Sequence, residues 1–185
     1  QESSLLAQAQ NSYNAENYDA SLAIAETMLE NDHKDFDALL MKGDSHQKKD
    51  EFELAIKSYS KANGIRKNSV ELYTNWGAAL LNTDDLNGAE KKLKTAISLD
   101  ETYAPAHYFL GNVKYADFNT GGAIKCYNKA IALDPKYRDA LYMRAASYAE
   151  NEQVGMALAD YEAVHKLDPS LNLVSLNMAV IKLDN

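Results

Sequence analysis

The sequence predicts an all-α fold that is built from one pair of helices, repeated along the chain. Hydrophobic residues make up 46% of the 185 residues and charged residues 25%, which is the balance of a folded globular chain. Apolar residues recur at spacings of three and four, and no stretch alternates with a period of two for long enough to indicate a sheet. The chain also resembles itself when it is shifted by 34 residues. These three observations together favour an α-solenoid.

The repeat is clearest at its small side chains. Gly43, Gly77 and Gly111 stand one period apart, and Ala9 and Ala145 take the same place at either end. A second small position is followed four residues later by a larger one in most repeats: Ser21, Ala55, Ala89, Ala123 and Ala157, then Ala25, Tyr59, Leu93, Tyr127 and Tyr161. We therefore expect one domain over 1–185, with repeats at 2–35, 36–69, 70–103, 104–137 and 138–171, and with 172–185 as half of a sixth repeat or a cap.

Each repeat reads as two amphipathic helices joined by a tight polar turn. In the fourth repeat, the spacing predicts a first helix near Ala104–Asp117 and a second near Thr120–Leu133. Pro135 and Pro169 end the second helix of two repeats, because proline lacks an N–H and disfavours helix at the residue before it. Two antiparallel helices approach closely only where a facing residue is small, so glycine and alanine mark the contact between them. Stacked pairs then bury a continuous core.

These residues resemble the tetratricopeptide repeat, whose signature is W-x2-L-G-x2-Y, then A-x3-F-x2-A, then P. The third and fourth repeats carry most of it: Tyr73, Trp76, Gly77, Leu80, Ala89, Leu93 and Ala96, then Leu110, Gly111, Ala123, Tyr127, Ala130 and Pro135. The first repeat departs furthest, with Ser21 and Ala25 at the packing positions. The resemblance implies a right-handed superhelix of helix pairs, whose concave groove is lined mainly by the first helix of each pair.

Composition argues against several classes of function. The formal net charge is −8, from 27 acidic and 19 basic residues, which does not favour nucleic acid or direct insertion into a membrane. Cys126 is the single cysteine, so no internal disulfide forms, and the four histidines do not pair at helical spacing. The segment at 120–125 lacks the spacing of a phosphate-binding loop. We therefore expect no catalytic residues, no metal, no cofactor and no enzyme activity.

The resemblance places particular side chains in the groove. Tyr108, Asn112, Tyr115 and Tyr142, with Asn82, are the candidate partner-binding residues. Tyrosine offers apolar area with a polar tip, and an asparagine can hydrogen-bond an extended peptide backbone. For Tyr115, packing between neighbouring first helices is an equally good interpretation.

The groove positions also argue against one partner known for the family, the acidic C-terminal tail of heat-shock chaperones. Asn112 matches one asparagine of the clamp that holds such tails, but Tyr108 stands where a lysine is needed. A carboxylate requires charged or multiple donors to offset the loss of its hydration. We expect weak binding of such tails or none.

The C-terminal segment is apolar nearly all round, and Leu176, Val180 and Leu183 are candidates for self-association. Three arrangements stay open: this helix packs fully on the fifth repeat, it is the cut end of a longer array, or it joins a second copy.

The sequence as a whole predicts a scaffold that binds a protein or peptide partner in its groove. The alternative is a self-associating protein that builds a homo-oligomer or a larger assembly, and a less favoured one is an accessory domain of a larger enzyme. The chain begins at Gln1 rather than Met, so a trimmed N-terminus is expected and the compartment, cytoplasmic or exported, stays open.

Overall fold

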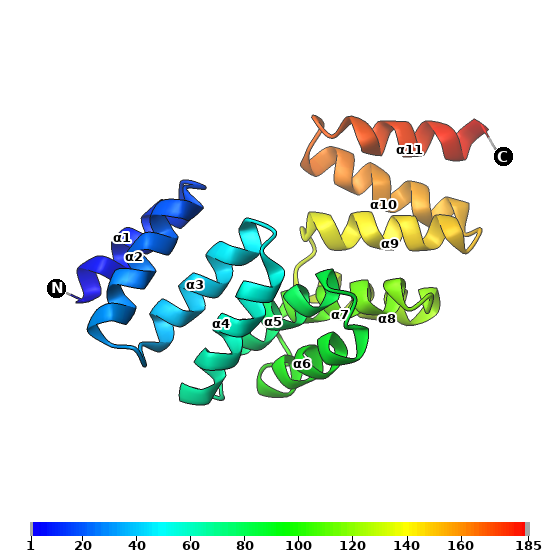
Figure 1. The fold of residues 1–185 in the computed structure, drawn as a ribbon. Coiled ribbons are helices and arrows are strands. Elements are labelled where there is room, and N and C mark those ends of the chain that lie inside the picture. The colour runs from blue at the N-terminus through cyan, green and yellow to red at the C-terminus, as the bar shows by residue number, and fades with distance from the viewer. Residues whose placement is uncertain (1, 184–185) are drawn as a thin grey trace. The chain divides into compact units, whose positions relative to one another are not determined.

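The computed structural model describes the backbone of residues 2–183 and the side chains of residues 4–181. Over this range it contains eleven α-helices and no strand, so the prediction of an all-α fold of stacked helix pairs is confirmed (Figure 1). The helices are α1 (Glu2–Asn14), α2 (Tyr18–Asn31), α3 (Phe36–Lys48), α4 (Phe52–Ile65), α5 (Val70–Asn82), α6 (Leu86–Leu99), α7 (Ala104–Ala116), α8 (Thr120–Leu133), α9 (Arg138–Glu150), α10 (Val154–Leu167) and α11 (Asn172–Leu183).

Consecutive helices pack as pairs, and the turn inside each pair has the same backbone geometry. Five residues, none of them glycine, have a positive φ between 56° and 61°: Glu16, Asp50, Asp84, Phe118 and Glu152. They are spaced by the period of the sequence repeat. Each lies between the two helices of a pair, where a left-handed residue lets the chain reverse direction within a few residues.

Several second helices begin with a side-chain cap. The Oδ1 atom of Asn17 accepts from the backbone N–H of Ala20 at 3.1 Å, and Asn119 accepts from Gly122 at 2.9 Å. Such caps satisfy N–H groups that have no partner inside the helix. The polar turn residues therefore specify where each second helix starts.

The small positions are close contacts between the two helices of a pair. A Cβ atom on Gly43 would lie 2.3 Å from Cε1 of Tyr59, and one on Gly111 would lie 2.4 Å from Cε1 of Tyr127. Both tyrosine side chains are fully buried. Glycine is therefore required for the helix axes to approach while a large ring fills the space between them.

The chain forms two compact units, Gln1–Leu99 (unit 1) and Asp100–Asn185 (unit 2), which are described separately below. In unit 1, α3 and α5 are the most buried helices, and Leu72, Trp76 and Leu93 contribute to the core. In unit 2, Leu141, Tyr161 and Val174 form a core that joins α9, α10 and α11. The expected repeat boundaries within a single domain stay a prediction.

Candidate interaction surfaces

In unit 2, α7 and α9 carry tyrosines that are only partly buried. Tyr108 and Tyr142 are both half-buried. The Tyr108 ring centroid lies 5.1 Å from that of Tyr137 and 6.2 Å from that of Tyr127, and the Tyr142 ring meets Tyr161 edge-on at 5.6 Å. Such aromatic pairs stabilise each other beyond the area that they bury, so the exposed parts of these rings are held in place.

Asn112 is engaged within the protein rather than free. Its Oδ1 atom accepts the hydroxyl of Tyr127 at 2.8 Å, and its side chain also hydrogen-bonds Tyr108. Burial raises the pKa of Tyr108, and the hydrogen bond from Asn112 partly opposes that rise. The expected role of Asn112 as a donor to a peptide backbone would have to coexist with these contacts.

Tyr115 and Tyr142 each reach a neighbouring helix through the hydroxyl group. The Tyr115 hydroxyl donates to Oε1 of Glu150, which ties α7 to α9, and this hydrogen bond together with burial raises the pKa of Tyr115 to about 12. The Tyr142 hydroxyl accepts from Nδ2 of Asn177 on α11 at 3.2 Å. This contact gives Tyr115 the packing role between neighbouring first helices, and its role in partner binding stays a prediction.

Asn82 is separate from these four residues, because it lies at the end of α5 in unit 1. Its Nδ2 atom donates to the carbonyl oxygen of Ala78 at 2.9 Å, and its side chain is exposed. The structure therefore brings Tyr108, Asn112, Tyr115 and Tyr142 onto α7 and α9 of one unit, and leaves Asn82 in the other.

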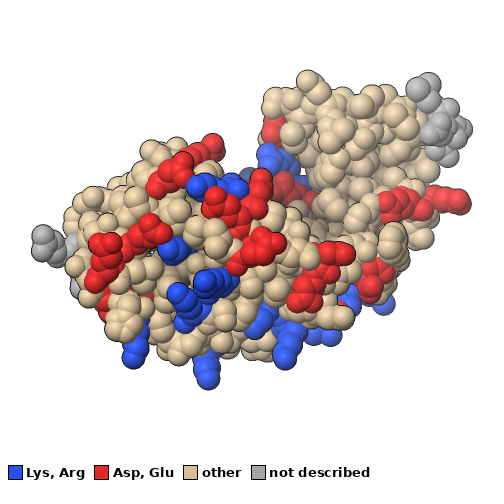
Figure 2. All heavy atoms as spheres, in the orientation of Figure 1, with Lys and Arg blue, Asp and Glu red and all other residues tan. Residues whose placement is uncertain are grey.

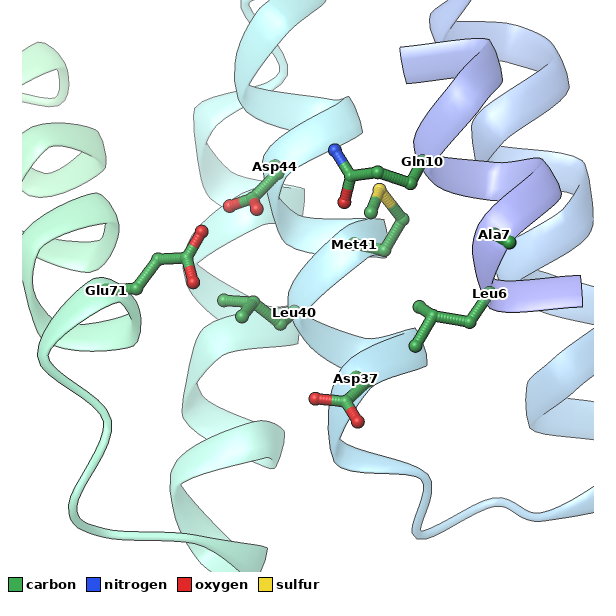
Figure 3. Close-up of a pocket in the computed structure, with 8 residues that line it drawn as sticks. All are labelled: Leu6, Ala7, Gln10, Asp37, Leu40, Met41, Asp44 and Glu71. Carbon is green, nitrogen blue, oxygen red and sulfur yellow. The ribbon is translucent and has the colours of Figure 1, made fainter. Parts of the chain in front are cut away.

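Unit 1 has an open pocket that the expected site residues do not include. Its volume is about 430 Å³, and first helices α1, α3 and α5 supply its lining. Figure 3 shows the eight lining residues: Leu6, Ala7, Gln10, Asp37, Leu40, Met41, Asp44 and Glu71. Six of them stand at the positions where the family places its groove, and three are acidic without a cation among the lining residues. This excess of acidic residues at groove positions is the sequence feature that could have indicated the pocket.

The carboxylates of Asp44 and Glu71 point toward each other in this pocket (Figure 3). Asp44 Oδ1 accepts from the Tyr59 hydroxyl at 2.7 Å and from Nδ2 of Asn75 at 2.9 Å. Burial nevertheless raises the pKa of Asp44 to about 6, Glu71 adds to the rise, and the two hydrogen bonds and Lys48 oppose it. Asp44 is thus a carboxyl group whose ionised form is disfavoured by its surroundings.

Five lysines of unit 1 lie on α4 and α6, which supply none of the lining of this pocket. On the face shown in Figure 2, lysine and arginine side chains project along the edge over α4 and α6. The exposed lysines of these helices include Lys57, Lys61, Lys91 and Lys94. Of the pocket carboxylates, Asp37 lies 3.6 Å from Nη1 of Arg66, in an exposed ion pair.

The helix α11 presents two different faces. Val174 is almost fully buried, and Leu171, Met178 and Ile181 pack against the core of unit 2. Leu173, Leu176 and Val180 are 53%, 59% and 49% exposed. The side chain of Leu183, the third expected self-association residue, lies outside the described residues.

The part of the chain that the structure describes has no group of three or more histidine, cysteine, aspartate or glutamate side chains that could hold a metal ion. Within the same range, none of the helices is both long and apolar enough to span a bilayer.

Comparison with known proteins places these features in a family. Two models of tetratricopeptide repeats match the chain, one over residues 6–69 and the other over residues 119–152. The small glutamine-rich tetratricopeptide repeat-containing protein 2 of Saccharomyces cerevisiae is 31% identical over 91 residues. That alignment covers 49% of this chain and 26% of the yeast protein, so the chain spans about a quarter of this relative's length.

Solved structures have the same fold. A thermophilic tetratricopeptide protein of Thermus thermophilus matches with a TM-score of 0.84 at 21% identity, over 99% of this chain and all of the other. YrrB, described as a tetratricopeptide protein with an unusual peptide-binding site, matches with a TM-score of 0.68 at 21% identity, over 91% of this chain and 87% of the other. At these identities the likeness establishes the fold alone.

Proposed function

Because this chain is a tetratricopeptide-repeat protein, we propose that it is a non-catalytic scaffold that binds a peptide or protein segment on the tyrosine surface of α7 and α9. This surface comprises Tyr108, Asn112, Tyr115 and Tyr142. The observation that carries the proposal is that Tyr108 and Tyr142 are only partly buried and yet are fixed by neighbouring groups.

Fixed aromatic groups favour binding for a physical reason. A tyrosine has few rotatable bonds, and its packing against other rings has already restricted those. A partner that covers such a ring therefore loses little additional side-chain entropy on binding. The described peptide-binding site of YrrB supports a peptide as the class of partner, although its sequence is only distantly similar.

The proposal extends to what this surface does not bind. Tyr108 offers no positive charge, and the oxygen of Asn112 already accepts the hydroxyl of Tyr127. An acidic chaperone tail would lose the hydration of its carboxylates without gaining a charged donor at these positions. Calorimetry with such a tail should detect weak binding or none, and tight binding that Asn112→Ala abolishes would contradict this part of the proposal.

The test of the proposal is affinity capture from native lysate with two matched pairs of variants. Tyr108→Ala with Tyr142→Ala removes two rings from the proposed surface and should release the captured partner. Tyr18→Ala with Tyr148→Ala also removes two half-buried tyrosines, but outside that surface, and should retain it. Capture that is equal with both pairs would show that the surface is wrongly assigned.

A second candidate function is self-association through α11. At the position that is buried as Gly43, Gly77, Gly111 and Ala145 in the earlier first helices, α11 carries Ala179, which is exposed. Leu176 and Val180 extend this uncovered face. A second copy would cover it, and light scattering should then show a dimer that Leu176→Glu with Val180→Glu dissociates. A strict monomer at all concentrations would exclude this candidate.

A further inference from the structure

The pocket of unit 1 combines an apolar side with an acidic side. Leu6 on α1 and Leu40 and Met41 on α3 supply apolar surface. Asp44 and Glu71 lie opposite Leu6, with their carboxylates turned toward each other (Figure 3). A side chain that entered between them would meet hydrocarbon along its length and negative charge at its end.

The acidic side is not neutralised by the residues that line the pocket, because none of them is lysine or arginine. Arg66 is an ion-pair partner of Asp37 alone among the three acids. Two facing carboxylates disfavour each other's ionised form, and a cation placed between them reverses that effect. The charge of this pocket therefore selects a cationic occupant.

We propose that this pocket binds a basic and apolar segment of a partner polypeptide, with a lysine or arginine head group at Asp44 and Glu71 and a neighbouring apolar side chain on Leu6, Leu40 and Met41. The volume of about 430 Å³ falls within the range of ligand sites and accommodates such side chains. A lysine or arginine stem is itself apolar, so it can lie along Leu40 while its head group reaches the carboxylates.

The surroundings of Asp44 support this occupant. Tyr59 on α4 and Asn75 on α5 donate hydrogen bonds to its carboxylate. Glu71 is a second negative charge nearby, Lys48 on the same helix as Asp44 is a positive one, and Tyr13 also interacts electrostatically with Asp44. With a pKa of about 6, Asp44 ionises across the pH range in which the protein would be assayed. Affinity for a cationic segment should therefore rise as the pH increases through this value.

This site is distinct from the tyrosine surface of α7 and α9, since the pocket is formed entirely within unit 1. Either site could bind without the other. The experiment is therefore arranged so that each can fail alone.

The test is selection from a display library of random linear peptides against the whole chain, followed by affinity measurement. We expect the selected peptides to be enriched in lysine or arginine beside a large apolar residue. Their affinity should fall at least about tenfold in Asp37→Asn with Asp44→Asn and Glu71→Gln, as expected for loss of charged partners. Three exposed acids outside the pocket supply a control of equal charge change: Glu30→Gln with Glu53→Gln and Glu162→Gln should leave affinity unchanged.

Glu71→Gln alone is the safeguard against a folding defect, because it leaves both hydrogen bonds to Asp44 in place. It should still weaken binding. The inference is overturned if no basic and apolar peptides are selected. It is also overturned if the selected peptides bind the triple pocket variant and Glu71→Gln as tightly as they bind the parent chain. Peptides that lose affinity only with Tyr108→Ala and Tyr142→Ala would support the proposed function and overturn this inference.

Discussion

The close contact between Gly111 and Tyr127 gives the sharpest prediction about the fold, and it concerns the tyrosine surface directly. Replacing Gly111 by alanine would place a Cβ atom 2.4 Å from Cε1 of Tyr127. The ring has no free space to move into, because Tyr127 is fully buried and its hydroxyl is bonded to Asn112. We therefore expect α7 and α8 to separate slightly and the Asn112 side chain to shift.

The magnitude follows from two opposing terms. Overpacking a core costs about 1–3 kcal/mol, and replacing glycine by alanine inside a helix returns up to about 1 kcal/mol. A Cβ atom 2.4 Å from a fully buried ring belongs at the upper end of the overpacking range, so the net expectation for Gly111→Ala is a loss of about 2 kcal/mol in the free energy of unfolding. For a chain of this size, that corresponds to a decrease of roughly 4–8 °C in Tm.

Gly64→Ala is the matched control, because a Cβ atom at Gly64 meets nothing within 4 Å and Gly64 also lies in a helix. It should gain about 0.5–1 kcal/mol. Thermal and urea unfolding of both variants, followed by circular dichroism, measures the difference. If Gly111→Ala proved as stable as the parent chain, the argument that glycine sets the distance between paired helices would be refuted.

Three further predictions concern single positions. Phe118 is 95% exposed at a φ of 56°, so Phe118→Gly should relieve strain and raise the free energy of unfolding by about 1 kcal/mol in urea titration, whereas an unchanged value would show that the turn is unstrained. Asp160 accepts two hydrogen bonds from Arg144, both at 2.7 Å, so Asp160→Ala should cost about 3 kcal/mol by leaving that guanidinium without its carboxylate, and a loss near zero would contradict the pairing. The pKa of Asp44 in the folded chain is about 6, against an ordinary 3.8, so the folded state binds more protons than the unfolded state between these values. Stability therefore falls as pH rises through this window and stays lower above it. Asp44→Asn should remove that fall and be the more stable form at neutral pH by about 1–2 kcal/mol, and identical pH profiles of stability for the two chains would contradict the shift.

The sequence predicted the fold well because the repeat is written in packing residues. Gly43, Gly77 and Gly111 are legible as a period, and each is needed for the same contact in space. The expected second helix of the fourth repeat, Thr120–Leu133, agrees with the bounds of α8. Local spacing determines such features, and the same local rule acts five times.

The candidate site was less predictable because side-chain hydrogen bonds depend on distances between helices. Periodicity placed Asn112 on the first helix of the fourth repeat, but it could not show that the hydroxyl of Tyr127, fifteen residues later, donates to the Asn112 oxygen. Likewise, Asp44 and Glu71 stand at positions where the family places its groove, yet their mutual orientation depends on how α3 and α5 pack. The uneven distribution of charge in the pocket follows from that packing.

The raised pKa of Asp44 has a cost in stability, which supports a functional role for the pocket. Asp44 lowers the stability of the folded chain at neutral pH, and an asparagine at this position would avoid that cost while still accepting hydrogen bonds. Residues that reduce stability are frequently retained for function. The stability measurement tests the cost of Asp44 to the fold, and the peptide selection tests its role in binding.

We propose that partner binding by this chain depends on the tyrosine surface of α7 and α9. The most direct test is calorimetric titration of the captured partner's binding segment into the parent chain, into Tyr108→Ala with Tyr142→Ala, and into Tyr18→Ala with Tyr148→Ala. We predict a loss of affinity of about tenfold or more for the first pair of substitutions and no change for the second. Equal affinity for all three proteins would contradict the claim.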